Sequence, residues 1–460
     1  MVLRTVSPID GRVVAEIEEF QESQIKGAVE VSKHAFSHIQ QTPLSQRIQW
    51  LNRFLELLDS CSDEAAKELT VQMGRPLKHA PIEISTAIMR SRYMISVAET
   101  ALSDDTVEHT ESYKKVIKKV PVGPTLVIFA WNYPYLILVN SLIPALLAGN
   151  SLLIKPSPQT PAIADRVVEL LRQAGLPQGV VQAIHCGNQN TLEKLIQNPE
   201  IKLVCFTGSV QGGRAVSKAA SERFIHVGLE LGGKDPAYIR DDADLDYTAE
   251  GVVDGALFNS GQSCCSIERV YVHKTVAGPF IERVKKLVST YTVGDPFDAS
   301  TMLGPVISER SAQTIQEHIK DAIHHGAKSI VNNISNAKLF PTFVSPCVLV
   351  DVNHSMRVMT EETFGPVIPI QVVESDEEAI QLMNDSIFGL TASVWTKDEV
   401  KGEDLCDRIE AGSTFVNRAD YPDPVLVWTG WKESGRGQTL SKYGFDLFTK
   451  LKSLHVKVHH

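Results

Sequence analysis

The chain has 460 residues, a formal net charge of −10 and a pI of about 5.8. This length exceeds what one simple core accommodates and predicts two or more domains, separate or interleaved. The acidic balance argues against nucleic acid or an anionic membrane as a partner, and no uninterrupted apolar run reaches membrane-spanning length.

The first hundred residues predict helices. Apolar residues recur at helical spacing in the segments 23–38, 45–58 and 85–102. A basic stretch, 112–120, follows them, and its lysines alternate with β-branched residues. This alternation predicts an edge strand or a hairpin with solvated lysines, or else an oligomer contact.

From residue 125 onward, expected strands alternate with expected helices, which is typical of a parallel, doubly wound sheet. Such sheets bind ligands at the carboxyl ends of their strands. The expected strands are 125–130, 151–155, 180–184 and 202–206, with helices at 134–147, 160–174 and 191–197. A second series from residue 232 has expected strands at 269–273 and 392–395 and helices at 276–292, 308–326 and 375–386.

Two adjacent cysteines follow a polar, glycine-containing segment, Phe258-Asn259-Ser260-Gly261-Gln262-Ser263-Cys264-Cys265. Its small residues predict a flexible approach to an exposed, reactive thiol. The chain has seven cysteines and no C-x-x-C pair, so neither a disulfide framework nor a metal site is expected. Cysteine usage and the lack of a secretory signal at the N-terminus predict a cytoplasmic location.

Two further polar residues could act beside such a thiol. Glu230 lies in an apolar stretch, where burial would raise its pKa and make it a general base. A structural glutamate paired with Lys234 or an arginine fits that position equally well. Asn132 follows a predicted strand, so its amide could face a developing oxyanion. Capping of the next helix is the commoner role for such an asparagine.

Three segments could bind an anionic or flat ligand. Residues 206–213 follow a strand and open a helix, so a phosphate could approach the helix N-terminus, although a plain turn explains the segment as well. Lys155 ends a strand and could reach a ribose or phosphate, or could be an ordinary surface lysine. Glu362 and Phe364 could grip a ribose and pack on a flat ring, or could belong to an ordinary loop.

Together and in this order, these motifs resemble those of the aldehyde dehydrogenase superfamily. The resemblance runs from residue 7 to residue 453. It is carried by six segments, Trp131-Asn132, Lys155-Pro156, Phe206-Thr207-Gly208-Ser209, Glu230-Leu231-Gly232-Gly233-Lys234, Gly261-Gln262-Ser263-Cys264 and Glu362-Thr363-Phe364-Gly365-Pro366.

The resemblance implies an α/β fold made of three parts. A Rossmann-like parallel-sheet domain that binds the cofactor would comprise residues 1–105 and 122–232. A second α/β domain, the catalytic one, would comprise residues 233–430. A small β oligomerisation element would comprise residues 106–121 and 431–460, and a homodimer or a dimer of dimers is expected.

The resemblance also assigns roles to residues. Cys264 is implied to attack an aldehyde, while Asn132 and the backbone N–H of Cys264 stabilise the oxyanion. The thiohemiacetal becomes a thioester after hydride transfer, and Glu230 activates the water that releases a carboxylic acid. The resemblance gives Cys265 no catalytic role and leaves it as the residue next to the nucleophile. The cofactor, NAD or NADP, is implied to contact Trp131, Lys155, Ser157, Gly208, Ser209, Gly213, Glu362 and Phe364, and no metal is implied.

Two departures and one retained residue bear on specificity. Pro158 stands where NAD-preferring members often have a ribose-binding glutamate, so we expect NADP to be tolerated. Asn140 stands where succinate-semialdehyde enzymes tend to have an arginine, so we expect an uncharged aliphatic or aromatic aldehyde. The tunnel that admits this aldehyde is expected to be lined by Tyr133, Leu136, Ile137 and Asn140. Glu230 favours hydrolysis, but a semialdehyde enzyme, a coenzyme A-acylating enzyme and a catalytically silent structural relative are the alternatives.

Overall fold

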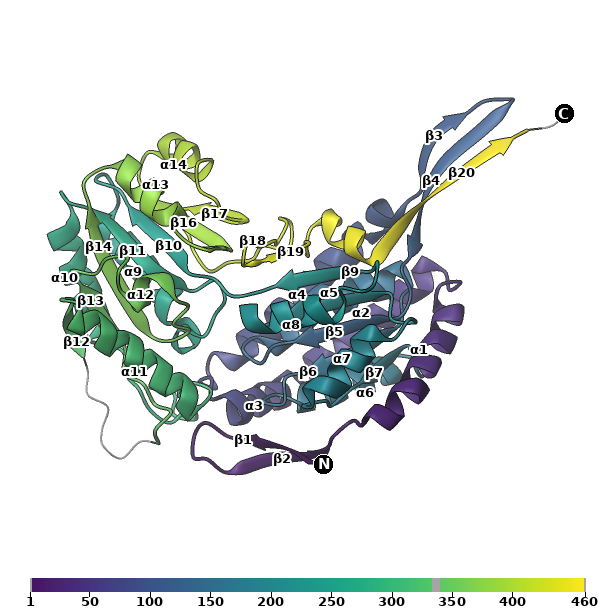
Figure 1. Cartoon of the computed structure of the whole chain (residues 1–460), viewed down its shortest axis with the longest axis horizontal. Helices are drawn as coiled ribbons and strands as arrows, with labels where there is room; N and C mark the ends of the chain where they lie inside the picture. The colour runs from purple at the N-terminus through teal and green to yellow at the C-terminus, as the bar shows by residue number, and fades with distance from the viewer. Residues whose placement is uncertain (1, 333–339, 459–460) are drawn as a thin grey trace.

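The computed structural model describes residues 2–332 and 340–458 and has a mixed α/β architecture. Two largely parallel sheets, each covered by helices, lie side by side (Figure 1). A narrow three-stranded sheet projects from the body beyond the first of them. Residues 1 and 460, which bound the expected domains, lie outside the described part of the chain.

The six-stranded sheet has its topological switch point between β5 and β8. The chain runs through β5, β6 and β7 toward one edge and then crosses to β8 and β9 on the other side of β5. All of these neighbours are parallel, and only β19 joins antiparallel. The strands are β5 (Thr125–Phe129), β6 (Leu152–Pro156), β7 (Val181–Ala183), β8 (Leu203–Thr207), β9 (His226–Glu230) and β19 (Gly435–Arg436).

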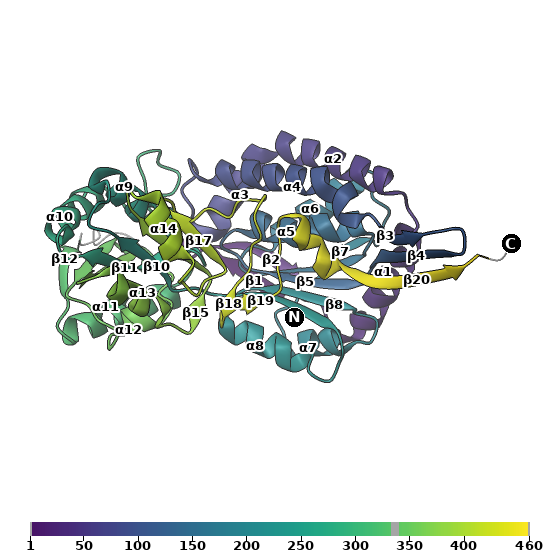
Figure 2. The same ribbon diagram turned by 90° about the horizontal axis from the view of Figure 1, so that it is seen from above.

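Helices cover both faces of this sheet. Every residue of β5 and β6 is buried, as expected for parallel strands that are covered on both sides. Seen from above, α2, α4 and α6 lie on one side and α7 and α8 on the other (Figure 2). The helices are α1 (Ile25–Ile39), α2 (Leu44–Ser60), α3 (Ser62–Met73), α4 (Ala80–Leu102), α5 (Pro134–Ala148), α6 (Ala162–Gln173), α7 (Gln189–Gln197) and α8 (Val210–Ala219).

The seven-stranded sheet runs in the order β12-β13-β14-β11-β10-β16-β17, and only β12 and β13 pair antiparallel. Its strands are β10 (Asp235–Ile239), β11 (Ile267–His273), β12 (Lys328–Asn332), β13 (Cys347–Val350), β14 (Val367–Val373), β16 (Thr391–Trp395) and β17 (Ser413–Val416). Its helices are α9 (Leu245–Leu257), α10 (Ala277–Val288), α11 (Glu309–His324), α12 (Arg357–Thr360), α13 (Asp376–Asn384) and α14 (Glu399–Cys406).

The projecting sheet corrects one expectation. The basic stretch forms β4 (Tyr113–Pro121), but β4 is the central strand of the order β20-β4-β3 and not an edge strand. The hairpin alternative is confirmed by β3 (Asp105–His109), and the C-terminal strand β20 (Thr449–Lys457) pairs with the other edge of β4. The local pattern of lysines does not indicate this pairing, because β20 is remote from β4 in the sequence.

Smaller elements complete the part of the chain that the structure describes. Two short antiparallel pairs and three 3₁₀ helices connect the larger layers. The pairs are β1 (Val2–Val6) with β2 (Val13–Glu18) and β15 (Phe388–Gly389) with β18 (Trp431–Lys432), and the 3₁₀ helices are η1 (Glu22–Gln24), η2 (Phe258–Gly261) and η3 (Lys442–Phe448). Among residues 2–332 and 340–458, no helix has both the length and the apolar composition that crossing a bilayer requires.

Candidate active site

A cavity of about 180 Å³ opens at the switch point of the six-stranded sheet. Open α/β sheets bind ligands there, outside the carboxyl ends of their strands. The segments that leave β5, β8 and β9 line it with Trp131 and Asn132, with Thr207 to Ser209, and with Glu230 to Gly232. Cys264, Glu362 and Phe364 complete the wall from the side of the seven-stranded sheet.

A second cavity of about 270 Å³ lies between α4, α5 and the loops around Cys264 and Asp420. All four residues predicted to line a substrate tunnel, Tyr133, Leu136, Ile137 and Asn140, line this cavity. The two cavities share five residues, Asn132, Ile137, Thr207, Glu230 and Cys264. A thiol, an amide and a carboxylate therefore lie where the two cavities meet.

The loop that carries Cys264 is buried and has an unusual backbone conformation. Asn259, Ser260 and Gly261 have φ values of 53°, 58° and 71°, so three consecutive residues are left-handed. Such backbone is unfavourable for non-glycine residues and persists only where the surroundings fix it. Here the segment is buried, and a Cβ at Gly261 would lie 2.2 Å from the carbonyl oxygen of Gly365.

Asn132 is held in place by contacts from this loop and from Arg75, which lies between α3 and α4. Its Nδ2 donates a hydrogen bond of 3.2 Å to the carbonyl oxygen of Gln262. Its own carbonyl oxygen accepts a hydrogen bond from the guanidinium of Arg75. The side chain does not cap α5, whose N-cap residue is Tyr133. One N–H of the Asn132 amide thus stays free for a ligand at the cavity junction.

Glu230 ends β9 and makes no ion pair with Lys234. Its carboxylate accepts hydrogen bonds from Thr439 Oγ1 at 2.6 Å and from Thr207 Oγ1 at 3.3 Å. Burial is the main reason that the pKa of Glu230 is raised, and the two hydroxyls oppose this effect. Two neutral donors therefore orient a carboxylate whose proton affinity is increased, as a general base requires.

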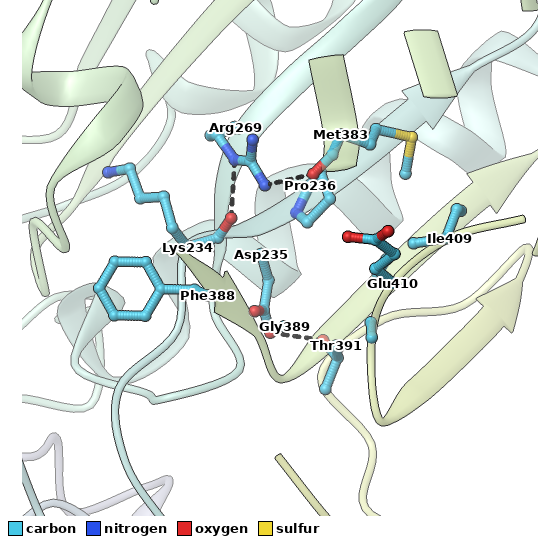
Figure 3. A pocket seen from close by; sticks show the side chains of 12 residues that line it. Lys234, Asp235, Pro236, Arg269, Met383, Phe388, Gly389, Thr391, Ile409 and Glu410 are labelled. Atoms are coloured by element: carbon cyan, nitrogen blue, oxygen red, sulfur yellow. Dashed lines mark hydrogen bonds between the residues drawn. The ribbon is translucent and has the colours of Figure 1, made fainter. Parts of the chain in front are cut away.

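Lys234 instead forms a buried ion pair with Glu268, at 2.6 Å. Glu268 also accepts the backbone N–H groups of Thr363 and Phe364 at 2.7 and 2.8 Å. These bonds fix Phe364 in a left-handed conformation, with φ of 51°. Figure 3 shows Arg269 beside Lys234, where its Nε donates to the Lys234 carbonyl oxygen at 2.7 Å. A buried polar network thus positions one wall of the first cavity.

The residues predicted to contact a cofactor divide into two groups. Five of them, Trp131, Gly208, Ser209, Glu362 and Phe364, line the first cavity. Trp131 and Phe364 meet edge to face, with ring centroids 5.7 Å apart. Ser209 caps α8 by accepting the N–H of Gly212 at 3.1 Å. This helix N-terminus and the small residues before it suit a phosphate.

Lys155, Ser157 and Gly213 lie outside the lining of that cavity. Lys155 is buried at the end of β6, so the surface-lysine alternative is wrong, and burial lowers its pKa. Ser157 accepts the N–H of Gln159 at 3.2 Å within its own turn. Gly213 allows α8 to approach Leu231, whose Cδ2 would lie 2.6 Å from an added Cβ.

Glu362 does not point freely into the cavity. Its Oε1 accepts the backbone N–H of Gly233 at 3.1 Å. An added Cβ at Gly232 would lie 2.5 Å from either carboxylate oxygen. Burial, followed by the nearby charge of Glu268, raises the pKa of Glu362 to about 8. The second oxygen, Oε2, makes no hydrogen bond with Gly233.

Cys265 lines the second cavity beside Cys264 and contacts Asp420. Its Sγ donates to Asp420 Oδ1 at 2.8 Å, and Ser263 Oγ donates to the same oxygen at 3.1 Å. Cys264 and Cys265 form no disulfide. Burial is the main reason that the pKa of Asp420 is raised to about 7. Cys265 is thus a neighbour of Cys264 that helps to anchor the 420 loop.

Sequence reasoning missed the charged residues of the second cavity. Arg75 and Glu83 form an ion pair with side chains that are 1% and 0% exposed. Arg90 lines the same cavity and donates to Asn140 Oδ1 at 3.5 Å. The second cavity therefore holds a cation at Arg90 beside the neutral amide of Asn140. Glu83 and Arg90 share one face of α4, but the helix predicted from the sequence began only at residue 85 and left Glu83 outside it.

The comparisons with known proteins agree with this architecture. The model of the aldehyde dehydrogenase family matches residues 2–454. An aldehyde dehydrogenase of Paenarthrobacter nicotinovorans is 32% identical over 99% of both chains. A glutarate-semialdehyde dehydrogenase of Pseudomonas aeruginosa is 30% identical over 98% of this chain and 93% of its own. The crystal structure of NADP-dependent glyceraldehyde-3-phosphate dehydrogenase from Bacillus halodurans, complexed with NADP, has 31% identity and a TM-score of 0.94, covering 100% of this chain and 96% of its own.

Proposed function

This chain belongs to the aldehyde dehydrogenase family and is an NAD(P)-dependent aldehyde oxidoreductase, and we propose that it oxidises an aldehyde to a carboxylic acid through a thioester on Cys264. The observation that carries this proposal is the junction of two cavities at Cys264, Asn132 and Glu230. One cavity suits a dinucleotide and the other an organic substrate, so both reactants would reach the same thiol.

In the first step, the Cys264 thiolate attacks the carbonyl carbon of the aldehyde. The free N–H of the Asn132 amide and the backbone N–H of Cys264 stabilise the oxyanion that forms. Loss of one such donor typically costs about 2.7–4 kcal/mol of transition-state stabilisation. The hydrogen bond from Asn132 to Gln262 fixes the amide before the substrate binds, so no reorganisation is needed during the reaction.

The first cavity fits the cofactor of this reaction. Trp131 and Phe364 offer apolar walls, Gly208 and Ser209 offer the helix N-terminus for a phosphate, and Glu362 would bind a ribose hydroxyl. Lys155, Ser157 and Gly213 are assigned by resemblance alone. When bound there, the nicotinamide nucleotide supplies the acceptor for the hydride that the thiohemiacetal carbon releases.

Cofactor choice depends on Pro158. A carboxylate at that position would repel a 2′-phosphate, and proline does not, so we propose that both NADP and NAD are accepted. Pro158 follows β6, and its carbonyl oxygen accepts a hydrogen bond of 2.8 Å from Thr5 Oγ1. The N-terminal segment thus supports the turn that holds Ser157 and Pro158.

In the last step, Glu230 removes a proton from the water that attacks the thioester carbon. The carbon–sulfur bond breaks, the carboxylic acid leaves, and the Cys264 thiolate is restored. The hydrogen bonds from Thr439 and Thr207 orient the carboxylate for this role. Because Glu230 lines both cavities, hydrolysis is favoured over transfer to coenzyme A.

The second cavity supports an aliphatic or aromatic aldehyde. Leu136, Ile137, Phe258 and Trp428 give it largely apolar walls. The expectation of an uncharged substrate depended on the neutral side chain of Asn140. Arg90, which donates a hydrogen bond to Asn140, adds a positive charge to that part of the cavity. A semialdehyde is therefore the second candidate substrate class.

The division of the chain into a cofactor domain (1–105 and 122–232), a catalytic domain (233–430) and an oligomerisation element (106–121 and 431–460) is part of the same proposal. Within 431–460, however, β19 pairs with β9 in the six-stranded sheet, and only β20 belongs to the projecting sheet. The projecting sheet carries exposed apolar side chains, such as Val107 and Leu451 at 61% and 73% exposure. We assign it to the subunit contact of a homodimer or a dimer of dimers. A cytoplasmic location remains a prediction.

One assay tests the central proposal. NAD(P)H formation is followed with a panel of aldehydes, with and without coenzyme A, in the wild type, Cys264→Ala and Glu230→Gln. We expect turnover without coenzyme A, none in Cys264→Ala, and a single burst of NAD(P)H in Glu230→Gln. Cys61→Ala, a partly buried cysteine after α2, is the matched control. Turnover that requires coenzyme A would establish the acylating alternative, and full activity of Cys264→Ala would refute the mechanism.

A further inference from the structure

Arg90 is a buried cation without a carboxylate partner. Its exposure is 6%. Nη1 donates to Asn140 Oδ1 at 3.5 Å, Nη2 donates to the carbonyl oxygen of Pro422 at 3.1 Å, and the buried Nε has no acceptor. Within residues 2–332 and 340–458, no carboxylate lies in ion-pairing range of Arg90, whereas the buried Arg75 and Lys234 each have one.

Burying the Arg90 guanidinium costs free energy unless a counter-charge or further hydrogen-bond acceptors are supplied. Burial disfavours the charged form of Arg90 and lowers its pKa, but a guanidinium stays protonated in proteins. Two hydrogen bonds to neutral oxygens satisfy only part of its five N–H donors. A buried charge is normally paired, and this one is not paired by the chain itself.

Arg90 lines the cavity that ends at Cys264. It lies on α4, on the face that also carries Glu83 and Thr86, and it faces Asn140 on α5. Leu136, Ile137 and Phe258 supply apolar walls to the same cavity. A ligand in it would therefore meet a thiol, an apolar passage and a single unpaired cation.

We propose that Arg90 binds a carboxylate carried by the substrate at the end away from its aldehyde, and that the enzyme prefers ω-oxo carboxylates to neutral aldehydes of equal length. This inference rests on the proposed function, since it names the substrate class of that same site. The carboxylate would supply the missing counter-charge and accept a pair of parallel N–H bonds from the guanidinium.

The other charged groups of the cavity do not fill this role. Glu83 is held by Arg75, and Glu230 is held by Thr439 and Thr207. One oxygen of Asp420 accepts from Ser263 and Cys265. Burial raises the pKa of Glu230, Asp254 and Asp420, which moves all three toward their neutral forms. One guanidinium balances a carboxylate but leaves half of a phosphate dianion uncompensated.

Matched aldehydes provide the test. We would measure kcat/KM for 4-oxobutanoate against butanal, and for 5-oxopentanoate against pentanal, in the full-length wild type, Arg90→Met and Arg90→Lys. The wild type should favour the charged member of at least one pair. In Arg90→Met the ratio of charged to neutral should fall roughly 10- to 100-fold, and Arg90→Lys should retain part of it. An unchanged ratio in Arg90→Met, or no preference in the wild type, would overturn the inference.

Further arms keep the test decisive. If Arg90→Met does not fold, succinate and glutarate should still slow alkylation of Cys264 in the wild type more than the corresponding diols do, and equal protection would count against the carboxylate site. A higher kcat/KM for glyceraldehyde 3-phosphate than for either oxo acid would also count against it. NAD(P)H formation from butanal without preference for oxo acids defeats only this inference, whereas no NAD(P)H from any aldehyde defeats the proposed function.

Discussion

Thr439 Oγ1 donates a hydrogen bond of 2.6 Å to Glu230 Oε1, although the two residues lie 209 positions apart. Thr439 is 4% exposed, and its backbone forms an antiparallel bridge with Trp428. A residue of the C-terminal segment thus orients the carboxylate that we assign as the base. This bond favours the ionised form of Glu230 and partly offsets the effect of burial on its pKa.

Replacement of Thr439 by valine should move the pH dependence of hydrolysis. The variant keeps the shape of the side chain but loses the donor, so the pKa of Glu230 should rise further. The acidic limb of the kcat profile should shift upward by about one pH unit, and acyl-enzyme should accumulate below the new pKa. Thr439→Ser, which keeps the hydroxyl, is the control. An acidic limb that stays in place in Thr439→Val would show that this bond does not tune Glu230.

The buried pair of Arg75 and Glu83 should be essential for stability. Arg75 also donates to Asn259 Oδ1 at 3.1 Å and to the carbonyl oxygen of Asn132. Arg75→Met leaves the Glu83 carboxylate buried and uncompensated, which should lower the free energy of unfolding by about 3–5 kcal/mol. Urea denaturation measures this loss. Arg53→Met breaks an exposed pair with Glu56 and should change stability by less than about 1 kcal/mol. Equal effects of the two variants would contradict the prediction.

Glu362 should make the protein less stable as the pH rises. Its pKa is raised to about 8 in the folded state, from an ordinary value of 4.5. Between these values the folded state holds a proton that the unfolded state has lost. Its stabilising contribution is therefore complete below the unfolded pKa and is lost as the pH rises through the folded pKa. In Glu362→Gln, the fall in urea midpoint between about pH 5 and pH 9 should be smaller than in the wild type. An identical slope would show that Glu362 ionises normally.

Pro158→Glu should shift cofactor preference toward NAD. A carboxylate at this turn would accept hydrogen bonds from ribose hydroxyls and repel a 2′-phosphate. The ratio of kcat/KM for NAD over NADP should increase by about tenfold or more. Pro158→Gln, which is polar but uncharged, separates the charge from the loss of proline. If both variants change the ratio equally, repulsion is not the cause. If the wild type already uses NAD almost exclusively, the proposal that Pro158 allows NADP to bind is wrong.

Local patterns in the sequence predicted much of the fold. The continuous apolar runs of β5 and β6 and the helical spacing of α1, α2, α4 and α6 were recognised because burial on a strand or helix repeats with a short period. Helix α3 was missed, and so were β9, β10 and most of the outer strands of the seven-stranded sheet. β4 was expected at an edge, because the partner that covers its second edge, β20, lies more than three hundred residues away.

The sequence by itself determined the family resemblance, the position of Cys264 after a polar, glycine-containing segment, and the residues that could serve as thiol, amide and carboxylate. These follow from short motifs whose chemistry depends on residue type and spacing. Only the tertiary structure decided that Lys155 is buried, that Lys234 pairs with Glu268 rather than Glu230, and that Arg90 reaches Asn140. Ion pairing and burial depend on distances between segments remote in sequence, and these exist only once the helices and sheets have packed together.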